Sequence, residues 1–491
     1  MSSFKNIYDV LVQMNKENPD EIALVFKNKR ITRRKLLNEV DCLANGLSKR
    51  GLKVGEKVAI ILSNQIEFIC FYFALAKKGL VMVPINWNLS AEAINELVSK
   101  QDIKYLIYDK ELFDFEILNE TVEIICDFFD FPYEDLLSNT NCSFDEESLE
   151  IKLENPFVIL LTSGTNGNPK QIMHTHQTLL VNAEEVVKQL EFNNKDIFLF
   201  STPLYSMFGV GGTLLAYISG ARIVLQQLYS PLSALQIIQE EMVTVHNGNI
   251  TMFIEELQLI EKNEFKINSL RIGMIGGSVL PESLIRDVES KMGMSLCITY
   301  GMTENAGAVT LVTPSIPSPQ RYNTVGKPIK NTKIKIVDDN GNTLEAGKWG
   351  EILIQTPSLC LGLNDSWFRT QDIGFIDSEQ NLNVIGRKKD IITRNNNSFS
   401  ISLLQSKIYD LSGIKMASCE MVDEDLILWV ALKEDYFLNE EVIINYCKEN
   451  FKDYEIPDSV LIYERFPLTG SGKINRAELK KSYRIMKSEG K

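Results

Sequence analysis

The chain has 491 residues, more than one hydrophobic core usually supports, so we expect two or three domains. Hydrophobic residues make up 44% and charged residues 24% of it, which excludes a disordered or fibrous protein. The formal net charge of −14 repels a phosphate backbone, and no cluster of lysines and arginines interleaved with aromatic residues offsets that repulsion. Nucleic acid is therefore excluded as a partner.

The first residues contain no basic start followed by an apolar stretch, so we expect no secretory signal. The apolar run at residues 68–76 is too short to cross a bilayer, so we expect no transmembrane segment. Eight scattered cysteines without close pairs are typical of buried thiols in a reducing cytosol. We therefore expect a cytoplasmic protein.

The first predicted element is an amphipathic helix with Thr32 as its N-cap and Gly51 as its stop. Short apolar runs typical of buried strands follow it at residues 58–62, 81–85, 105–108, 158–161, 197–200 and 223–225. Segments with helical spacing, such as 91–98 and 232–241, lie between several of these runs. This alternation predicts an α/β fold with helix-flanked, substantially parallel sheets.

The pattern changes after about residue 320. Alternating strands are predicted at 333–337 and 351–354, with a turn signal between them, so we expect a small β-rich module at about 320–386 inside a large N-terminal domain, 1–386. The charged segment 387–390 predicts a hinge. A strand near 426–432 and a helix near 439–451 predict a small mobile α+β C-terminal domain, 391–491.

A loop rich in glycine and hydroxyl side chains follows the predicted strand 158–161. It reads Leu161-Thr162-Ser163-Gly164-Thr165-Asn166-Gly167-Asn168-Pro169-Lys170. Such a loop after a strand can form a phosphate cradle. Its spacing differs from that of a Walker loop, which disfavours an ordinary P-loop NTPase. For this segment taken alone, a plain polar loop is the alternative.

Three further segments make the pattern specific. They are Tyr300-Gly301-Met302-Thr303-Glu304, Trp367-Phe368-Arg369-Thr370-Gln371-Asp372 and Pro467-Leu468-Thr469-Gly470-Ser471-Gly472-Lys473-Ile474. With the loop, they resemble in order the motifs of the adenylate-forming superfamily, which contains acyl-CoA synthetases, free-standing adenylation domains and firefly-type luciferases. A chance match of four ordered motifs is improbable. The resemblance implies an enzyme that uses ATP and Mg²⁺ to activate a carboxylic acid as its acyl-adenylate.

The resemblance also implies a role for each motif. Tyr300 would stack on adenine, Thr303 would hydrogen-bond the α-phosphate, and Glu304 would coordinate Mg²⁺. Asp372 would accept the ribose hydroxyls. Lys473 would bridge the carboxylate and the α-phosphate in the transition state. The remaining nucleotide-binding residues implied are Thr162, Ser163, Gly164, Thr165, Asn166, Gly167, Lys170, Gly276, Gly277, Ser278, Gly301 and Arg387.

The chain departs from these motifs at Asn166, which replaces a hydroxyl residue, and at Gln171 and Gln371, which replace glycines. The segment 203–209 resembles the one that lines the acyl pocket in this superfamily, and it places Tyr205 and Ser206 there. It offers no carboxylate for a substrate ammonium, whose burial would then be costly. A fatty or aryl acid is therefore favoured over an α-amino acid.

The resemblance implies that the acceptor is a thiol, and it favours CoA. The resemblance places Lys389 at the hinge about which the C-terminal domain would rotate. Asn396 lies where CoA-using relatives show glycine, and asparagine tolerates left-handed backbone. Two alternatives stay open: an enzyme that loads the phosphopantetheine of an acyl carrier protein or another nucleophile, and a weakened nucleotide-binding protein. Retained Lys473 and Glu304 argue against the last.

Overall fold

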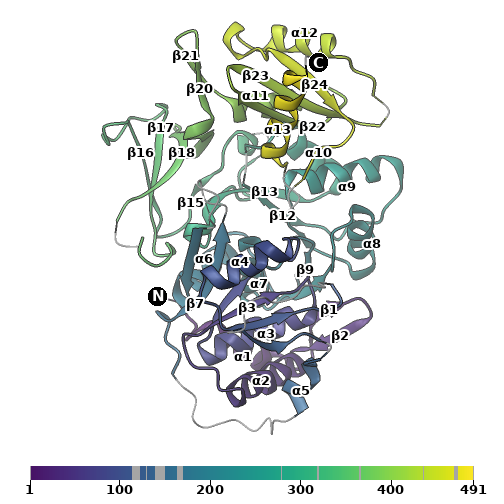
Figure 1. Ribbon diagram of the computed structural model, residues 1–491, viewed down its shortest axis with the longest axis vertical. Coiled ribbons are helices and arrows are strands. Elements are labelled where there is room, and N and C mark those ends of the chain that lie inside the picture. Colours follow the sequence, from purple (N-terminus) through teal and green to yellow (C-terminus); the bar gives the residue numbers. More distant parts are fainter. Residues whose placement is uncertain are drawn as a thin grey trace.

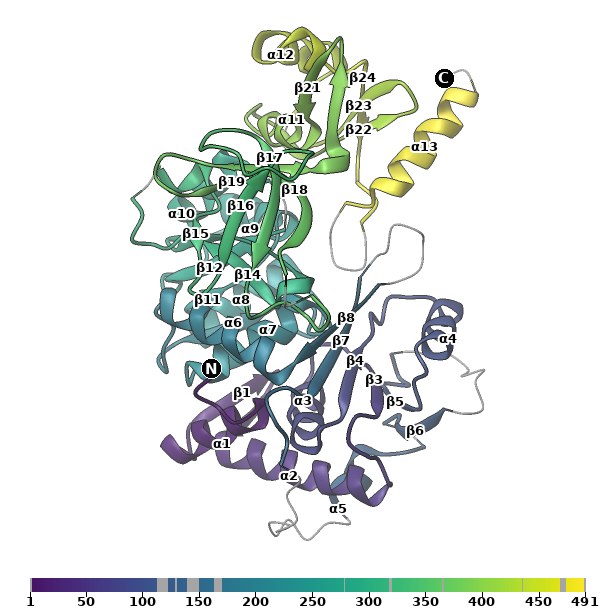
Figure 2. The same ribbon diagram turned by 90° about the vertical axis from the view of Figure 1, so that its left-hand side faces the viewer.

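The computed structural model describes residues 2–112, 122–128, 130–138, 150–162, 170–277, 279–317, 320–363, 366–434, 436–468 and 474–489. Helices flank two large sheets, and smaller sheets follow toward the C-terminus (Figure 1). In the turned view of Figure 2, a four-stranded sheet lies between the two large sheets and the C-terminal elements. This arrangement confirms the predicted α/β class.

The first large sheet has six strands in the order β6-β5-β3-β4-β7-β8. Its pairs are parallel except for β7 with β8, which form an antiparallel hairpin. Its strands are β3 (Lys57–Ile61), β4 (Val81–Pro84), β5 (Tyr105–Tyr108), β6 (Glu123–Cys126), β7 (Pro156–Thr162) and β8 (Lys170–Thr175). The hairpin matters for function because the predicted phosphate loop connects its two strands.

The second large sheet has nine strands in the order β15-β14-β13-β12-β11-β9-β10-β1-β2. Its central pairs are parallel and its two edges are antiparallel. Its strands are β1 (Ile22–Phe26), β2 (Lys29–Thr32), β9 (Ile197–Phe200), β10 (Arg222–Leu225), β11 (Val245–His246), β12 (Ile272–Gly276), β13 (Ser295–Met302), β14 (Gly307–Leu311) and β15 (Lys327–Pro328). The 3₁₀ turn η1 (Thr303–Asn305) joins β13 to β14.

The helices around these sheets bury apolar stripes against them. Helix α2 begins where Thr32 Oγ1 accepts from the Lys35 backbone N–H at 3.2 Å, as the sequence predicts. Helix α3 is buried on almost every side because its central residues are nearly all apolar. The helices of this part are α1 (Ile7–Glu17), α2 (Arg33–Lys49), α3 (Ile66–Lys78), α4 (Ala91–Lys100), α5 (Tyr133–Ser138), α6 (His176–Gln189), α7 (Met207–Ile218), α8 (Pro231–Glu241), α9 (Ile250–Lys262) and α10 (Glu282–Met292).

The third sheet is antiparallel and follows the order β16-β17-β18-β19. Its strands are β16 (Lys333–Val337), β17 (Gly350–Gln355), β18 (Phe368–Ile376) and β19 (Leu382–Arg387). One hydrophobic cluster joins Tyr300 and Val309 of the second sheet to Ile352 and Ile354 of this one. The cluster therefore packs the end of β13 against the third sheet.

The C-terminal elements form their own hydrophobic cluster around β22 and β23. They are η3 (Lys388–Asp390), β20 (Ile391–Arg394), β21 (Asn397–Ser400), α11 (Ile401–Ile408), β22 (Ile414–Val422), β23 (Asp425–Leu432), α12 (Glu440–Asn450), β24 (Ser459–Tyr463) and α13 (Arg476–Ser488). The predicted hinge 387–390 falls on η3 and the end of β19. The domain boundaries themselves stay a prediction.

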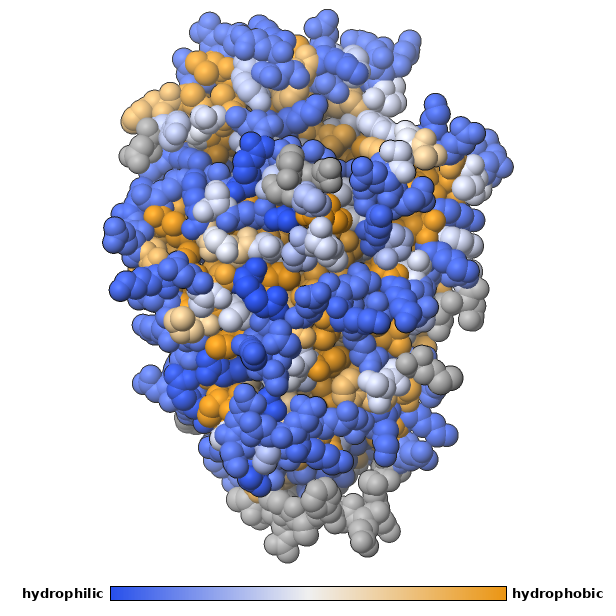
Figure 3. All heavy atoms as spheres, turned by 180° about the vertical axis from the view of Figure 1, so that it is seen from behind, coloured by the Kyte–Doolittle hydropathy of each residue, from blue (hydrophilic) through white to orange (hydrophobic). Residues whose placement is uncertain are grey.

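Among the described residues, six cysteines, including Cys70 and Cys297, are buried free thiols, as the sequence predicts. Cys42 departs from that prediction because it is disulfide-bonded. Figure 3 shows a face covered mostly by hydrophilic residues, with apolar residues gathered in smaller groups between them. Over the ranges given above, no helix combines the length and the apolar composition that crossing a membrane requires.

Candidate active site

The turn end of the β7–β8 hairpin carries the first motif. Thr162 pairs with Lys170 as the last pair before the loop, so the two ends of the loop are held side by side. Gln171, which stands in place of a glycine, is an exposed strand residue opposite Leu161 and fits there without crowding the backbone. The loop residues predicted to contact phosphates lie outside the described residues; they are Ser163, Gly164, Thr165, Asn166 and Gly167.

The second motif ends in a tight turn at η1. The Asn305 side chain closes this turn: its Oδ1 accepts from the Met302 backbone N–H at 2.9 Å, and its Nδ2 donates to the Ala308 carbonyl at 2.9 Å. Because the turn is closed from within, the backbone positions of Thr303 and Glu304 are defined. Both residues stand at the carboxyl end of β13, as their predicted roles require.

The hairpin and the turn meet in an ion pair. Lys170 Nζ lies 3.1 Å from Glu304 Oε1, and the two side chains are 52% and 19% exposed. An ion pair this exposed contributes little to stability. Mg²⁺ usually takes one or two protein carboxylates together with phosphate oxygens, and lysine is a common phosphate ligand. These two residues therefore fit a magnesium-bound triphosphate, with Glu304 as the carboxylate.

Asp372 of the third motif is held by two partners. Tyr300 Oη donates to Asp372 Oδ2 at 2.7 Å, and Arg387 Nε lies 3.0 Å from Asp372 Oδ1. Strand register places Arg387 directly opposite Asp372. Burial raises the pKa of Asp372, and the Arg387 guanidinium opposes that rise. The Tyr300 ring is buried and orients this carboxylate, while its stacking on adenine stays a prediction.

Gln371 adopts a backbone conformation that explains why glycine is usual at its position. Its φ is 63°, in the left-handed region. Its Nε2 donates to Glu351 Oε1 at 2.9 Å, and the same buried carboxylate pairs with Arg369 at 2.5 Å. The side chain therefore offsets the cost of the backbone, and the neighbouring Asp372 keeps its place.

We expect Gln371→Ala to lower the free energy of unfolding by about 1 kcal/mol, because it removes the hydrogen bond and keeps the left-handed strain. Gln371→Gly should recover most of that loss, since glycine adopts this φ without strain. Denaturant unfolding of both variants measures the difference. Equal stability of the alanine and glycine variants would contradict this account of the position.

The predicted adenine ledge is a turn at the end of β12. Gly276 lies so close to β13 that a Cβ would stand 2.5 Å from a backbone carbonyl oxygen, and Gly277 has a φ of 90°. Gly301 is packed more tightly still: a Cβ added to it would lie 1.5 Å from the Gly307 carbonyl oxygen. Gly276 and Gly301 therefore serve close packing of the backbone, whereas Gly277 provides the left-handed conformation of the turn. Ser278 lies outside the described residues.

The predicted acyl-pocket residues precede α7. Ser206 is the N-cap of that helix: its Oγ accepts from the Gly209 N–H at 3.2 Å and donates to the Pro203 carbonyl at 2.7 Å. This capping role was not predicted from the sequence. Burial raises the pKa of Tyr205 to about 12, so its hydroxyl is neutral near pH 7. Neither side chain is charged near pH 7, and both the acyl pocket and their contact with substrate stay predictions.

Two residues of the predicted hinge, Lys388 and Asp390, form ion pairs with different parts of the chain. Lys388 Nζ lies 2.9 Å from Asp339 Oδ1, near the third sheet, whereas Asp390 Oδ2 lies 3.7 Å from Arg476 Nη1 of α13. Lys389 stands exposed between them. The hinge role of Lys389 stays a prediction. Lys473 lies outside the described residues, just before α13.

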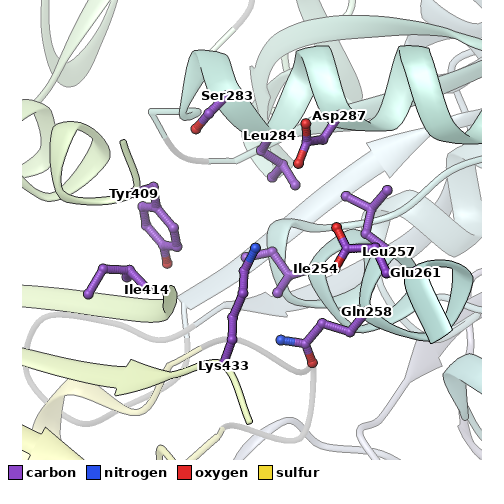
Figure 4. Close-up of a pocket in the computed structure, with 10 residues that line it drawn as sticks. All are labelled: Ile254, Leu257, Gln258, Glu261, Ser283, Leu284, Asp287, Tyr409, Ile414 and Lys433. Atoms are coloured by element: carbon purple, nitrogen blue, oxygen red, sulfur yellow. The ribbon is translucent and has the colours of Figure 1, made fainter. Parts of the chain in front are cut away.

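A cavity of about 80 Å³ lies elsewhere, between α9 and α10 on one side and the C-terminal elements on the other (Figure 4). Tyr409, Ile414 and Lys433 line it from the C-terminal side. None of the predicted site residues lines it, so it is distinct from the candidate active site.

Two buried residues support the site without having been predicted for it. Asn182 of α6 donates to the Ala308 carbonyl at 2.7 Å and accepts from the Ala308 N–H at 3.2 Å, beside η1. His174 of β8 lies 2.7 Å from the Thr303 carbonyl oxygen through its Nε2. The only sequence signal was a polar residue inside an otherwise buried segment, which does not identify a partner more than 100 residues away.

Comparison with known proteins identifies the family of this chain and several relatives. The AMP-binding enzyme family matches residues 11–363. The 2-succinylbenzoate–CoA ligase of Bacillus licheniformis is 26% identical over 96% of this chain and 98% of its own. The medium-chain fatty-acid–CoA ligase of Escherichia coli is 27% identical over 97% of this chain and 90% of its own. The crystal structure of the anthranilate CoA ligase AuaEII with anthranoyl-AMP has a similar fold, with a TM-score of 0.90, 22% identity and 98% of each chain covered.

Proposed function

The chain belongs to the AMP-binding enzyme family and is an AMP-forming acid–thiol ligase, and we propose that it joins an apolar fatty or aryl acid to CoA. One observation carries this proposal: the short segment 300–304 contacts both Asp372 and Lys170. A carboxylate predicted to bind ribose and a lysine predicted to bind phosphate thus both contact this segment at the end of β13. Such convergence is what a nucleotide needs in order to be held at both its sugar and its phosphates.

Two half-reactions follow. In the first, a carboxylate oxygen of the acid attacks the α-phosphorus of ATP, the acyl-adenylate forms and pyrophosphate leaves. In the second, a thiolate attacks the acyl carbon and AMP leaves. Lys170 and Thr303 hold phosphates, Asp372 holds the ribose, and Lys473 stabilises the charge that develops in the first step. Mg²⁺ held by Glu304 would neutralise phosphate charge.

The class of acid is inferred from the beginning of α7. Gly209 and Gly212 of this helix lie against backbone or an aromatic ring, which accounts for their lack of a side chain. Gly211 differs, because a Cβ there would meet nothing closer than the Met207 Sδ at 3.6 Å and the Ala306 carbonyl oxygen at 3.9 Å. Glycine within a helix costs about 1 kcal/mol relative to alanine. We interpret the space beside Gly211 as room for an uncharged acyl group.

We expect Gly211→Leu to lower kcat/KM for long or aromatic acids at least tenfold, because its side chain would fill that space, and to spare acetate or propionate. Initial rates across an acid series measure the change. Gly211→Ala is the matched control, since it adds one methyl group and stabilises the helix by about 0.5–1 kcal/mol. A uniform loss over all acids would contradict the assignment.

CoA is favoured as the acceptor because the turn predicted to line its tunnel is formed. Asn395 and Asn396 connect β20 and β21 in a two-residue turn with φ of 49° and 61°. A type I′ hairpin turn requires positive φ at both central residues, and asparagine is favoured there. The alternatives are a carrier-protein phosphopantetheine or another nucleophile, and a protein that only binds nucleotide.

The deciding experiment is pyrophosphate release from MgATP across a panel of fatty, aryl and amino acids, with and without CoA. Acid-dependent release that CoA stimulates supports the proposal and names the acid. Release that depends on the acid but not on CoA would favour a carrier protein or another nucleophile. No release with any acid would overturn the proposal in favour of nucleotide binding alone.

A further inference from the structure

His174 connects the phosphate hairpin to the end of the second motif. It lies on β8, four residues after Lys170 and therefore on the same face of the strand. Lys170 contacts the Glu304 side chain, and His174 Nε2 lies 2.7 Å from the carbonyl oxygen of Thr303. One strand face thus holds two consecutive residues of η1, one by a side chain and the other by its backbone.

The protonation of His174 follows from its surroundings. The side chain is fully buried, and burial lowers its pKa to about 4, so the ring is neutral near pH 7. A carbonyl oxygen can only accept, so Nε2 carries the proton and donates to Thr303. Nδ1 lies 3.0 Å from Thr178 Oγ1 at the start of α6, which fixes the ring plane. Both ring nitrogens are therefore engaged.

The backbone of the next residue is held as well. The Cys360 N–H donates to the Glu304 carbonyl at 2.8 Å, and the Leu361 N–H donates to the Met173 carbonyl of β8 at 2.9 Å. Both carbonyl groups of the Thr303–Glu304 pair are thus occupied. These hydrogen bonds restrain the backbone of the pair, while its two side chains are left to face a ligand.

We propose that His174 is a positioning residue that holds the Thr303–Glu304 backbone so that the Glu304 carboxylate faces magnesium-bound phosphates. The inference rests on the proposed function, because it assumes that Glu304 faces a magnesium nucleotide. Without the hydrogen bond from Nε2, the direct contact between η1 and β8 among the described residues would be the exposed Lys170–Glu304 pair, and the link through Cys360 and Leu361 would remain as an indirect one. Glu304 would then sample more orientations and hold the metal less tightly.

The test compares two amides at position 174. The glutamine of His174→Gln is long enough to donate to the Thr303 carbonyl, whereas the asparagine of His174→Asn is one methylene shorter and does not reach it. His176→Gln is the matched control: His176 is equally buried and its pKa is lowered to about 3, but its Nδ1 accepts from the Ile7 N–H, away from η1.

The readout is the gain in ATP affinity that Mg²⁺ brings, measured by titrating each variant with ATP in Mg²⁺ and in EDTA. We expect His174→Asn to reduce this gain about tenfold, and His174→Gln and the His176 control to stay within about twofold of the unchanged protein. Equal gains in the asparagine and glutamine variants would overturn the proposal. If His174→Asn does not fold, His174→Leu takes its place in the same comparison.

The ATP-binding measurement distinguishes a failure of this inference from a failure of the proposed function. If no acid supports pyrophosphate release, the ligase proposal fails, but the Mg²⁺-dependent gain still reports on His174. A thermal melt of each variant accompanies the titrations. A variant that loses thermal stability while keeping the full Mg²⁺ gain would show that His174 serves the fold alone, and that result also overturns the proposal.

Discussion

Replacement of Lys473 by alanine is expected to lower acyl-adenylate formation about 10³-fold, the upper range for loss of one preorganised electrostatic partner. The reason is that the first half-reaction concentrates negative charge between the attacking carboxylate and the α-phosphate. Thiol attack on a finished acyl-adenylate moves charge onto the acyl oxygen and the departing AMP, but the predicted rotation about the hinge would by then have carried Lys473 away from them. Transfer to CoA from supplied acyl-adenylate should therefore stay within about threefold of the unchanged enzyme.

Rapid-quench measurement of each half-reaction separates the two effects. Lys481→Ala is a suitable control, since this lysine is an exposed residue of α13 only eight positions away in the sequence. It should leave both half-reactions unchanged. Equal loss of adenylation and transfer in Lys473→Ala would mean that the lysine serves the C-terminal region as a whole and not the first step.

Continuous apolar runs made the strands predictable. Residues 105–108 and 197–200 match β5 and β9 end for end, because polar or charged residues flank each run and both strands are buried within their sheets. The hairpin of β1 and β2 was not predicted. Its second strand lies at a sheet edge with two of its four residues exposed, so no apolar run marks it. Its first strand is an apolar run, residues 22–26, that was not predicted as a strand.

The site was predictable only where its residues form contiguous motifs. Asp372 was assigned from its motif, but the hydroxyl that orients it belongs to Tyr300, 72 positions away. His174 and Asn182 are isolated polar residues whose partners lie 129 and 126 positions away. Such contacts depend on how the sheets pack together, and neither periodicity nor spacing encodes that packing.

Glu351 is a further residue whose environment cannot be predicted from the sequence. It lies in a strand that alternation predicts correctly, yet its carboxylate is 97% shielded because Arg369 and Gln371 cover it, leaving 3% exposed. A single sequence presents this glutamate as an ordinary charge on a solvated face. Its burial becomes understandable only when the left-handed Gln371 is seen to direct its amide toward it.

The second large effect is expected for Asp372. We predict that the unchanged enzyme prefers ATP over 2′,3′-dideoxy-ATP by about 10²-fold in kcat/KM, because two ribose hydroxyls donate to a charged acceptor. Asp372→Ala should lose most of that preference. Its affinity for ATP should fall toward that for the dideoxy nucleotide, while the dideoxy nucleotide itself is used about as well as before.

The comparison of two nucleotides distinguishes ribose recognition from simple damage to the fold. Asp372→Ala leaves the Tyr300 hydroxyl buried without its acceptor, which alone costs about 1–3 kcal/mol of stability. That cost applies to both nucleotides and cancels in their ratio. Tyr300→Phe is the complementary variant: it keeps the carboxylate and its Arg387 partner, so most of the preference for ATP should survive. An unchanged preference in Asp372→Ala would place the ribose elsewhere and leave Asp372 as a structural partner of Tyr300 and Arg387.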